Sequence, residues 1–381
     1  MERRQFIRIA GGGAVLAALA PVAGCSSALP PEALTAWQPP AEMTDVRHWL
    51  LAHAILAPHS HNLQSWLVDL STPGTLLLRI DRTRLLPETD PFSRQMMMSQ
   101  GTFLALLEIA ARERGLRADI TLFPEGVFDD RTVDDRPTAR VVLSADASQP
   151  PDPLFQQIFR RHTNRGPYDT RYPGAEGLEA IRQSQQGYPV RIGFTKPDDA
   201  ALDRHRAIAK AAWRIELETP HTLLESYKVL RIGPREIAEH RDGISINDPL
   251  VRALAAAGLF DRSKPSAPGD RALEGQIRDF NQTVDATPAF FWMVTADNQR
   301  PTQVLAGMAY ARAQLAATRH GLSMHPLQQA LQEYPEQAGP YADIRSVLGV
   351  SGSEVVQMWA RLGHGPMVQP APRRGWQAHV V

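Results

Sequence analysis

A short basic segment near the middle of the chain contains the residue types that bind phosphate groups. Three arginines and one threonine lie within six residues, namely Arg160, Arg161, Thr163 and Arg165. An apolar pattern just before them predicts a helix over 153–161. A guanidinium presents planar, paired donors that match a phosphate dianion, so this helix end is a candidate anion site. An isolated segment of this kind is more often a solvated helix end than an anion site. A second feature of the sequence is needed to choose between the two.

The second feature is the segment 57–66, which reads Ala-Pro-His-Ser-His-Asn-Leu-Gln-Ser-Trp. Together the two segments resemble the FMN-binding signatures of the nitroreductase superfamily, a basic R-[HS]-[ST]-x-[RK] segment and a P-S-x-x-N-x-Q-P-W segment. Their order is reversed relative to a standard nitroreductase. The reversed order resembles the Acg-like branch, in which one chain carries two nitroreductase-like halves and imitates the usual homodimer. The resemblance covers roughly residues 40 to 380.

The resemblance implies one FMN site per chain, divided between the two halves. Arg161 and Thr163 match the phosphate-binding Arg and Ser of the family, with Arg160 beside them. Arg165 matches the basic residue that reaches the pyrimidine edge, where it would stabilise anionic reduced flavin. No catalytic triad or carboxylate pair is required, because the flavin itself supplies the redox chemistry.

The other half of the implied site comes from the earlier segment and from the tail. Ser60, Asn62 and Gln64 match the segment that the partner subunit lends in an ordinary dimer. Arg373 and Arg374 resemble the carboxy-terminal basic clamp on the phosphate, and a solvated tail is the alternative. The sequence departs from the family at Ser65, where proline is usual, and at 324–327, where Met-His-Pro-Leu replaces the segment that carries a glutamate near flavin N5.

An internal repeat supports two related halves. The segment 101–116 matches 307–322 without a gap, so that Gly101 aligns with Gly307 and every pair is 206 residues apart. Six positions are identical, including an Ala-Ala doublet and a Gly-Leu ending. Each copy predicts an amphipathic helix that ends at a C′ glycine. Both resemble the central helix of the nitroreductase fold, where small residues let the second copy approach closely.

The amino terminus predicts export. Arg3 and Arg4 with the mild apolar stretch 9–20 resemble a twin-arginine signal, which is too short to span a bilayer as a mature helix. The sequence Val-Ala-Gly-Cys ending at Cys25 resembles a lipobox, so acylation of this single cysteine is expected. An ordinary signal with an incidental cysteine is the alternative. The expected location is the periplasm or a membrane reached only through a lipid anchor, with the twin-arginine export machinery as a partner.

Length and composition fit a globular protein with two domains. The chain has 381 residues, of which 43% are hydrophobic, and 41 basic residues balance 41 acidic ones. This balance gives no general attraction to nucleic acid. Proline clusters mark the boundaries of a signal with lipobox over 1–25, a tether over 26–40, a first half over 41–150 and a second half over 151–381. Such a pseudo-dimer is expected to be monomeric.

Hydrophobic periodicity predicts an α+β fold. Helices are expected at 45–56, 101–115, 153–161, 198–218 and 302–320, and strands at 64–70, 75–80, 117–123, 139–143, 190–194, 289–295 and 358–363. The segment 222–279 is predicted to be a mostly helical insertion that has no counterpart in the first half.

Two alternatives concern single residue types. His53, His59 and His61 contain the H-x-H spacing of metal sites, although no cysteine is nearby. Histidines that are satisfied by the protein or that contact the cofactor are the favoured interpretation, so no metal is expected. The consecutive residues Met96, Met97 and Met98 cannot share one face of a helix, so core filling is favoured over a soft-metal strip.

Two functions remain open from the sequence. The first is an exported FMN-dependent oxidoreductase that reduces small electrophiles, such as nitroaromatics and quinones, by ping-pong hydride transfer. The second is an FMN-binding or storage protein with a covered flavin and little turnover. The insertion at 222–279 bears on this choice, because it would have to cover the open face of the flavin in a storage protein.

Overall fold

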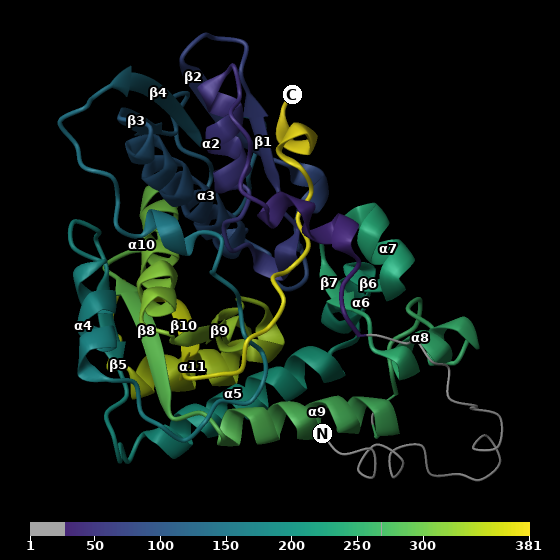
Figure 1. Cartoon of the computed structure of the whole chain (residues 1–381). Helices are drawn as coiled ribbons and strands as arrows, with labels where there is room; N and C mark the ends of the chain where they lie inside the picture. Colours follow the sequence, from purple (N-terminus) through teal and green to yellow (C-terminus); the bar gives the residue numbers. More distant parts are fainter. Residues whose placement is uncertain (1–26, 268) are drawn as a thin grey trace.

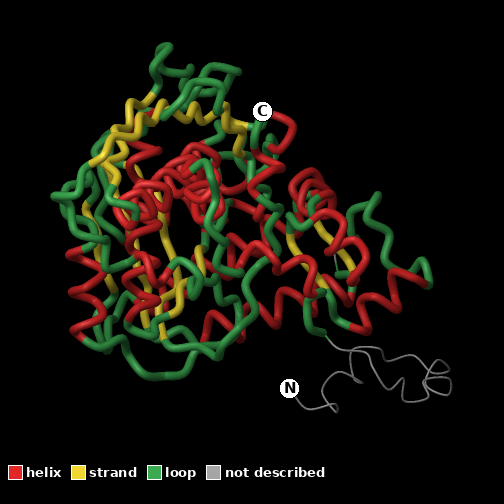
Figure 2. The backbone as a smooth tube through the Cα atoms, turned by 45° about the horizontal axis from the view of Figure 1, so that its top comes forward, coloured by secondary structure: helices red, strands yellow, loops and turns green. Residues whose placement is uncertain are grey.

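The computed structural model describes residues 27–267 and 269–381. The predicted signal and lipobox, including Cys25, lie outside the described residues. Within them the chain forms two four-stranded antiparallel sheets with helices between them (Figures 1 and 2). The predicted α+β fold with two tandem units is thereby confirmed. In the described part of the chain, every helix falls short of the length and apolar character that a membrane span needs.

The first unit consists of a sheet of order β1-β2-β4-β3 that packs against one long helix. Its elements are α2 (Val46–Ala54), β1 (Trp66–Asp69), β2 (Thr75–Ile80), α3 (Arg94–Glu113), β3 (Leu116–Leu122) and β4 (Ala139–Ala145). The chain enters through a 3-10 helix, η1 (Pro31–Trp37). Helix α3 begins earlier than the sequence predicted and includes Met96, Met97 and Met98, which are all buried, so core filling is confirmed.

The second unit has the sheet order β5-β8-β10-β9. Its elements are α4 (Ala175–Gln183), β5 (Arg191–Phe194), α5 (Leu202–Glu218), β8 (Ala289–Thr295), α10 (Arg300–Arg319), β9 (Ser323–Pro326), α11 (Ala338–Val347) and β10 (Val355–Gly363). The predicted helix over 153–161 is wrong. Only a short 3-10 turn, η4 (Phe155–Gln157), forms there, because the chain soon leaves the helical path and Thr163 pairs with Met324 of β9.

The insertion between α5 and β8 is mostly helical, as predicted. It contains α6 (Pro220–Lys228), α7 (Gly233–His240), α8 (Pro249–Ala256) and α9 (Arg271–Asp285). It also contains a parallel pair that the sequence did not predict, β6 (Leu230–Ile232) and β7 (Ile244–Ile246). These elements gather at one side of the molecule around a small apolar cluster of their own (Figure 1).

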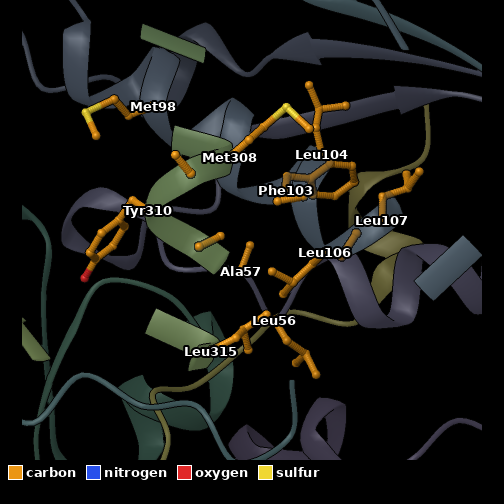
Figure 3. Close-up of a cluster of buried hydrophobic side chains, with 14 of the residues drawn as sticks. Leu56, Ala57, Met98, Phe103, Leu104, Leu106, Leu107, Met308, Tyr310 and Leu315 are labelled. Atoms are coloured by element: carbon orange, nitrogen blue, oxygen red, sulfur yellow. The ribbon is translucent and has the colours of Figure 1, made fainter. Parts of the chain in front are cut away.

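The two repeated helices form the centre of the molecule. Helix α3 covers 94–113 and α10 covers 300–319, so both ends keep the offset of 206 residues. The helices cross at their glycines: a Cβ atom on Gly101 would lie 1.9 Å from the carbonyl oxygen of Val304, and one on Gly307 would lie 1.9 Å from that of Met98. These contacts are reciprocal, because 98 and 304 also differ by 206. Side chains of both helices share one cluster (Figure 3).

The carboxy-terminal tail joins the units. After β10 the chain returns to the first unit, where Arg373 donates its backbone N–H to the carbonyl of Ala33 and Val380 pairs with Val68 of β1. A final 3-10 turn, η7 (Trp376–His379), lies against α2 and β1. The tail therefore carries residues 372–374 to the loop that follows α2 (Figure 1).

Candidate functional site

The loop after α2 has an unusual backbone. His61, Asn62 and Gln64 have φ values of 47°, 56° and 56°, which place three non-glycine residues in the left-handed region. Such residues cost free energy and persist only where their surroundings hold them, and they cluster at functional sites. Ser60 and Asn62 bound the turn η2 (Ser60–Asn62), in which Ser60 Oγ donates to Gln95 Oε1 of α3 at 3.1 Å.

The tail holds this loop in place. Asn62 Nδ2 donates to the carbonyl of Pro372 at 3.0 Å, and the Arg373 guanidinium donates to Asn62 Oδ1. The backbone N–H of Arg374 donates to Gln64 Oε1 at 3.0 Å, while its guanidinium donates to the Gln64 carbonyl at 2.6 Å. The structure thus brings Asn62, Gln64, Arg373 and Arg374 together. Arg373 is only 2% exposed, so the alternative of a solvated tail is wrong at this residue.

Arg161 joins the same cluster from the second unit. Its Nε and Nη2 donate to the carbonyl of Leu56 at 3.2 and 3.0 Å, and its Nη1 donates to Gln314 Oε1 of α10 at 3.1 Å. Arg373 donates to the neighbouring carbonyls of Ile55 and Ala57, each at 2.9 Å. These carbonyls follow the last turn of α2, where the helix dipole favours positive charge.

The two guanidiniums are buried cations whose hydrogen-bond partners are all uncharged oxygens. Both lie near the Trp37 ring, at 5.6 Å for Arg161 and 5.4 Å for Arg373. Neither forms an ion pair with a carboxylate in the described part of the chain. Burial lowers the pKa of Arg161 to about 10, and burial together with the charge of Arg161 lowers the pKa of Arg373 well below its usual value. Isolated buried charge is costly, so this pair favours an anion.

Two half-buried arginines elsewhere in the protein are neutralised by a shared carboxylate. Arg312 of α10 and Arg112 of α3 both donate to Asp152 Oδ2, at 2.9 and 3.0 Å. Asp152 itself is buried. This arrangement is the usual one for buried charge. Arg361 and Arg300, which are 0% and 2% exposed, also have only uncharged hydrogen-bond partners. Arg161 and Arg373 differ from them in that two such cations lie close enough for the charge of one to act on the other.

The other three residues predicted from the basic segment do not join the cluster of Arg161 and Arg373. Thr163 is half-buried and lies beside β9, where Asn164 donates its N–H to the carbonyl of Met324 at 3.2 Å. Arg165 has an exposed side chain, yet its charge acts on two histidines, His61 and His325. Arg160 is exposed on the surface, and the structure does not bring its side chain to the cluster.

Both of these histidines are neutral at pH 7. Burial and then the charge of Arg165 lower the pKa of His61 to about 4. The same two causes, with Arg361 as a third, lower the pKa of His325 well below its usual value. A neutral imidazole has one donor and one acceptor nitrogen, so both residues can accept or donate a hydrogen bond to a ligand beside Arg165.

The sequence interpretation missed Arg361 and Tyr310. Arg361 lies in β10, is fully buried, donates to Thr287 Oγ1 at 2.7 Å and stacks on the Tyr168 ring at 4.1 Å. A single arginine in the otherwise apolar strand 358–363 was the available signal. Tyr310 of α10 has a buried hydroxyl with no hydrogen-bond partner among the described residues, and it points away from the labelled apolar cluster (Figure 3).

The histidines that suggested a metal have partners in the protein. His53 Nδ1 lies 2.8 Å from the carbonyl of Trp49, and His59 Nε2 lies 2.7 Å from Ser65 Oγ. Burial lowers the pKa of His53 to about 4 and that of His59 to about 3. The described residues contain no group of three metal-ligating side chains. Ser65, at the position where proline is usual in the family, therefore fixes the His59 ring.

The insertion also forms hydrogen bonds with the loop that carries Asn62 and Gln64. Gly243 donates its N–H to the carbonyl of Asn62 at 3.1 Å, and Gln64 Nε2 donates to the carbonyl of Arg241 at 2.9 Å. Asp242, between them, is buried and pairs with Arg84 of the first unit and with Arg231. The insertion thus supports the strained loop directly.

Comparison with known proteins identifies relatives over most of the chain, although no family model matches it. A Mycobacterium tuberculosis (strain H37Rv) protein named "Putative NAD(P)H nitroreductase Rv3131" is 27% identical over 345 residues, which cover 85% of this chain and 88% of the relative. The probable NAD(P)H nitroreductase PigM of Serratia sp. is 24% identical over 343 residues, covering 85% and 90%.

Solved structures also match. The FMN- and NADPH-dependent nitroreductase NfnB of Sphigopyxis sp. strain HMH is 19% identical, with a TM-score of 0.36, and the match covers 59% of this chain and 96% of that one. An FMN-bound nitroreductase of Bacteroides fragilis is 13% identical, with a TM-score of 0.35, covering 58% and 95%. In sequence, the chain is thus similar over 85% of its length to curated proteins that are named as NAD(P)H nitroreductases.

Proposed function

We propose that this protein is an exported FMN-dependent oxidoreductase of the nitroreductase type that reduces small electrophiles such as nitroaromatics and quinones. The observation that carries the proposal is the pair Arg161 and Arg373, two buried cations without a carboxylate that meet at the junction of the two units. The sequence similarity to curated nitroreductases supports it.

The residues present fit the chemistry of FMN. Its phosphate is a dianion, and Arg161 and Arg373 are positioned to neutralise one. The Tyr310 hydroxyl is a buried group that still has hydrogen-bonding capacity. Arg165 offers a guanidinium for the pyrimidine edge, and its charge acts on the neutral imidazoles of His61 and His325.

The protein's contribution is binding and electrostatics. Bound FMN supplies two-electron redox chemistry. Arg161 and Arg373 would hold the phosphate, and the strained loop 59–64, which the tail and the insertion hold in place, would offer polar groups to the ring system. The positive charge of Arg165 favours negative charge that develops beside it. Because both units supply these residues, one chain provides both halves of the site that two subunits would form in a homodimer. We therefore expect a monomer.

A second candidate function is FMN storage with little turnover. It is favoured by the insertion, whose residues 241–243 contact the loop that carries Asn62 and Gln64. An insertion that also covered the reactive face of the ring would prevent a substrate from stacking on it.

The visible spectrum and the reoxidation rate of the purified protein test both functions. We expect about one non-covalent FMN per chain, and reoxidation of the dithionite-reduced protein at a rate that rises with the concentration of a nitro compound or quinone. A colourless protein that takes up no added FMN would overturn the proposal. Slow reoxidation that is independent of every acceptor concentration would favour storage.

Export is tested separately. Replacing Arg3 and Arg4 together by lysine is expected to leave flavin-loaded protein in the cytoplasm, because the twin-arginine signature needs both guanidiniums. Cys25→Ala is expected to abolish acylation. Cell fractionation and labelling with a radioactive fatty acid measure the two effects. Absence of acyl label from the wild-type protein would overturn the lipid anchor but would leave the signal intact.

A further inference from the structure

The insertion exposes an apolar surface. Every residue of α8 is described and none is buried, and the segment 253–259, which begins in α8 and runs past its end, consists only of alanine, leucine and glycine. Leu254 is 37% exposed and Leu259 is 74% exposed. We call α8 together with 257–259 the apolar lobe. An exposed apolar surface that is contiguous is a candidate contact site.

The amino-terminal segment is attached next to this lobe. Asn247, which precedes the α8 N-cap Asp248, donates its side-chain N–H to the carbonyl of Ala28. Leu29 is held as well, because its N–H donates to Gln369 Oε1 at 2.9 Å. Ala28 is therefore held beside α8.

The chain length then limits how far a lipid anchor can lie from the lobe. Cys25 precedes Ala28 by three residues. A fully extended chain spans at most about 3.6 Å per residue, so the Cys25 backbone lies within about 11 Å of Ala28. An acyl chain on Cys25 must enter the bilayer, and the headgroup surface consequently lies close to α8. An interfacial helix buries its apolar face to a depth of about 5–10 Å, which is comparable.

We infer that the apolar lobe docks onto the lipid bilayer to which the protein is anchored. The inference rests on the lipid attachment proposed above. The lobe inserts Leu254 and Leu259 among the acyl chains near the headgroups. Arg252 at one end meets the headgroup phosphates, whereas Lys264 beyond the other end pairs with Asp261 at 3.3 Å. The anchor and the lobe together give the two membrane contacts that stable attachment requires.

The single cysteine allows a direct test. The full-length chain is coupled through Cys25 to a maleimide phospholipid in vesicles of phosphatidylethanolamine and phosphatidylglycerol, and amide hydrogen exchange is compared with that of the uncoupled chain. Exchange over 249–260 is expected to slow about tenfold or more on the vesicles, since the bilayer excludes water from the lobe. Chemical coupling makes this readout independent of acylation in the cell.

Two variants provide the comparison. The double variant Leu254→Glu with Leu259→Glu is expected to abolish the protection and to weaken vesicle binding of the uncoupled chain about tenfold or more, because burying a leucine contributes on that scale. Val127→Glu is the matched control, since Val127 is 51% exposed in the first unit, and it should leave both readouts unchanged. Unchanged melting temperatures confirm that the variants fold.

Other outcomes would overturn the inference. Equal exchange over 249–260 in coupled and uncoupled protein would show that the lobe stays in water even when the anchor is present. Protection that appears only in native membranes, and not in pure lipid vesicles, would identify a protein partner instead of the bilayer. If acyl labelling fails in cells while the coupled protein shows protection, the lipid anchor fails and the docking surface stands.

Discussion

Replacing Gly101 or Gly307 by alanine is expected to lower the free energy of unfolding by about 3 kcal/mol. Each new Cβ atom would lie 1.9 Å from a backbone carbonyl oxygen of the other central helix. Backbone atoms cannot rotate away as the end of a side chain can, so α3 and α10 would have to separate. Chemical denaturation of the purified protein, followed by circular dichroism, measures the change.

Gly339 provides the matched control. It lies in α11, and no atom would lie within 4 Å of a Cβ added there. Gly339 lies in the first turn and precedes Pro340, which offsets the better helix propensity of alanine, so Gly339→Ala is expected to change the free energy of unfolding by less than about 0.5 kcal/mol. If Gly101→Ala and Gly307→Ala behaved like this control, the close approach of the two helices would be wrong.

The repeat was predictable because each copy is one short, continuous segment of the sequence. A gapless match between 101–116 and 307–322 needs only residue identities, and the structure confirms two helices with the same offset at both ends. Close packing of two backbones requires small residues at the crossing. The aligned glycines Gly101 and Gly307 show this requirement in the sequence. The strands β2 and β8 were likewise predicted at their observed limits, because each has a clear apolar pattern bounded by polar or turn residues.

The basic segment shows why other elements were not predictable. The apolar residues over 154–159 fit a helix, but tertiary contacts turn the chain so that Arg161 reaches the carbonyl of Leu56 and Thr163 pairs with Met324. The short strand β9 was missed because it ends at Pro326 and its pairing depends on Arg361 and its neighbours in β10. Long-range pairing of this kind leaves little trace in a local window.

The candidate site was predicted in its residue types and only partly in its geometry. Asn62, Gln64, Arg161 and Arg373 come together from segments far apart in the sequence. Arg160 does not join them, since its side chain is exposed. No local rule distinguishes two adjacent arginines when one faces solvent and the other faces the carbonyls beyond a helix end.

Arg161→Met is expected to remove the preference of the protein for FMN over riboflavin. The two ligands differ only in the phosphate, so the ratio of their dissociation constants isolates the contribution of the phosphate contact. A hydrogen bond to a charged group contributes about 1.5–3 kcal/mol, and FMN binding should therefore weaken by roughly 10- to 150-fold. Riboflavin binding should change little. Titration of the apoprotein, followed by flavin fluorescence, measures both constants.

Two further variants assign the effect to the phosphate. Arg165→Ala is expected to weaken FMN and riboflavin by similar factors, because the pyrimidine edge is common to both ligands. Arg312→Met removes a half-buried arginine that pairs with Asp152, so it should reduce stability and leave the ratio unchanged. If Arg161→Met weakened both flavins equally, Arg161 would act by holding the carbonyls of the loop after α2. The buried cation pair would then stabilise the junction of the two units without binding the phosphate.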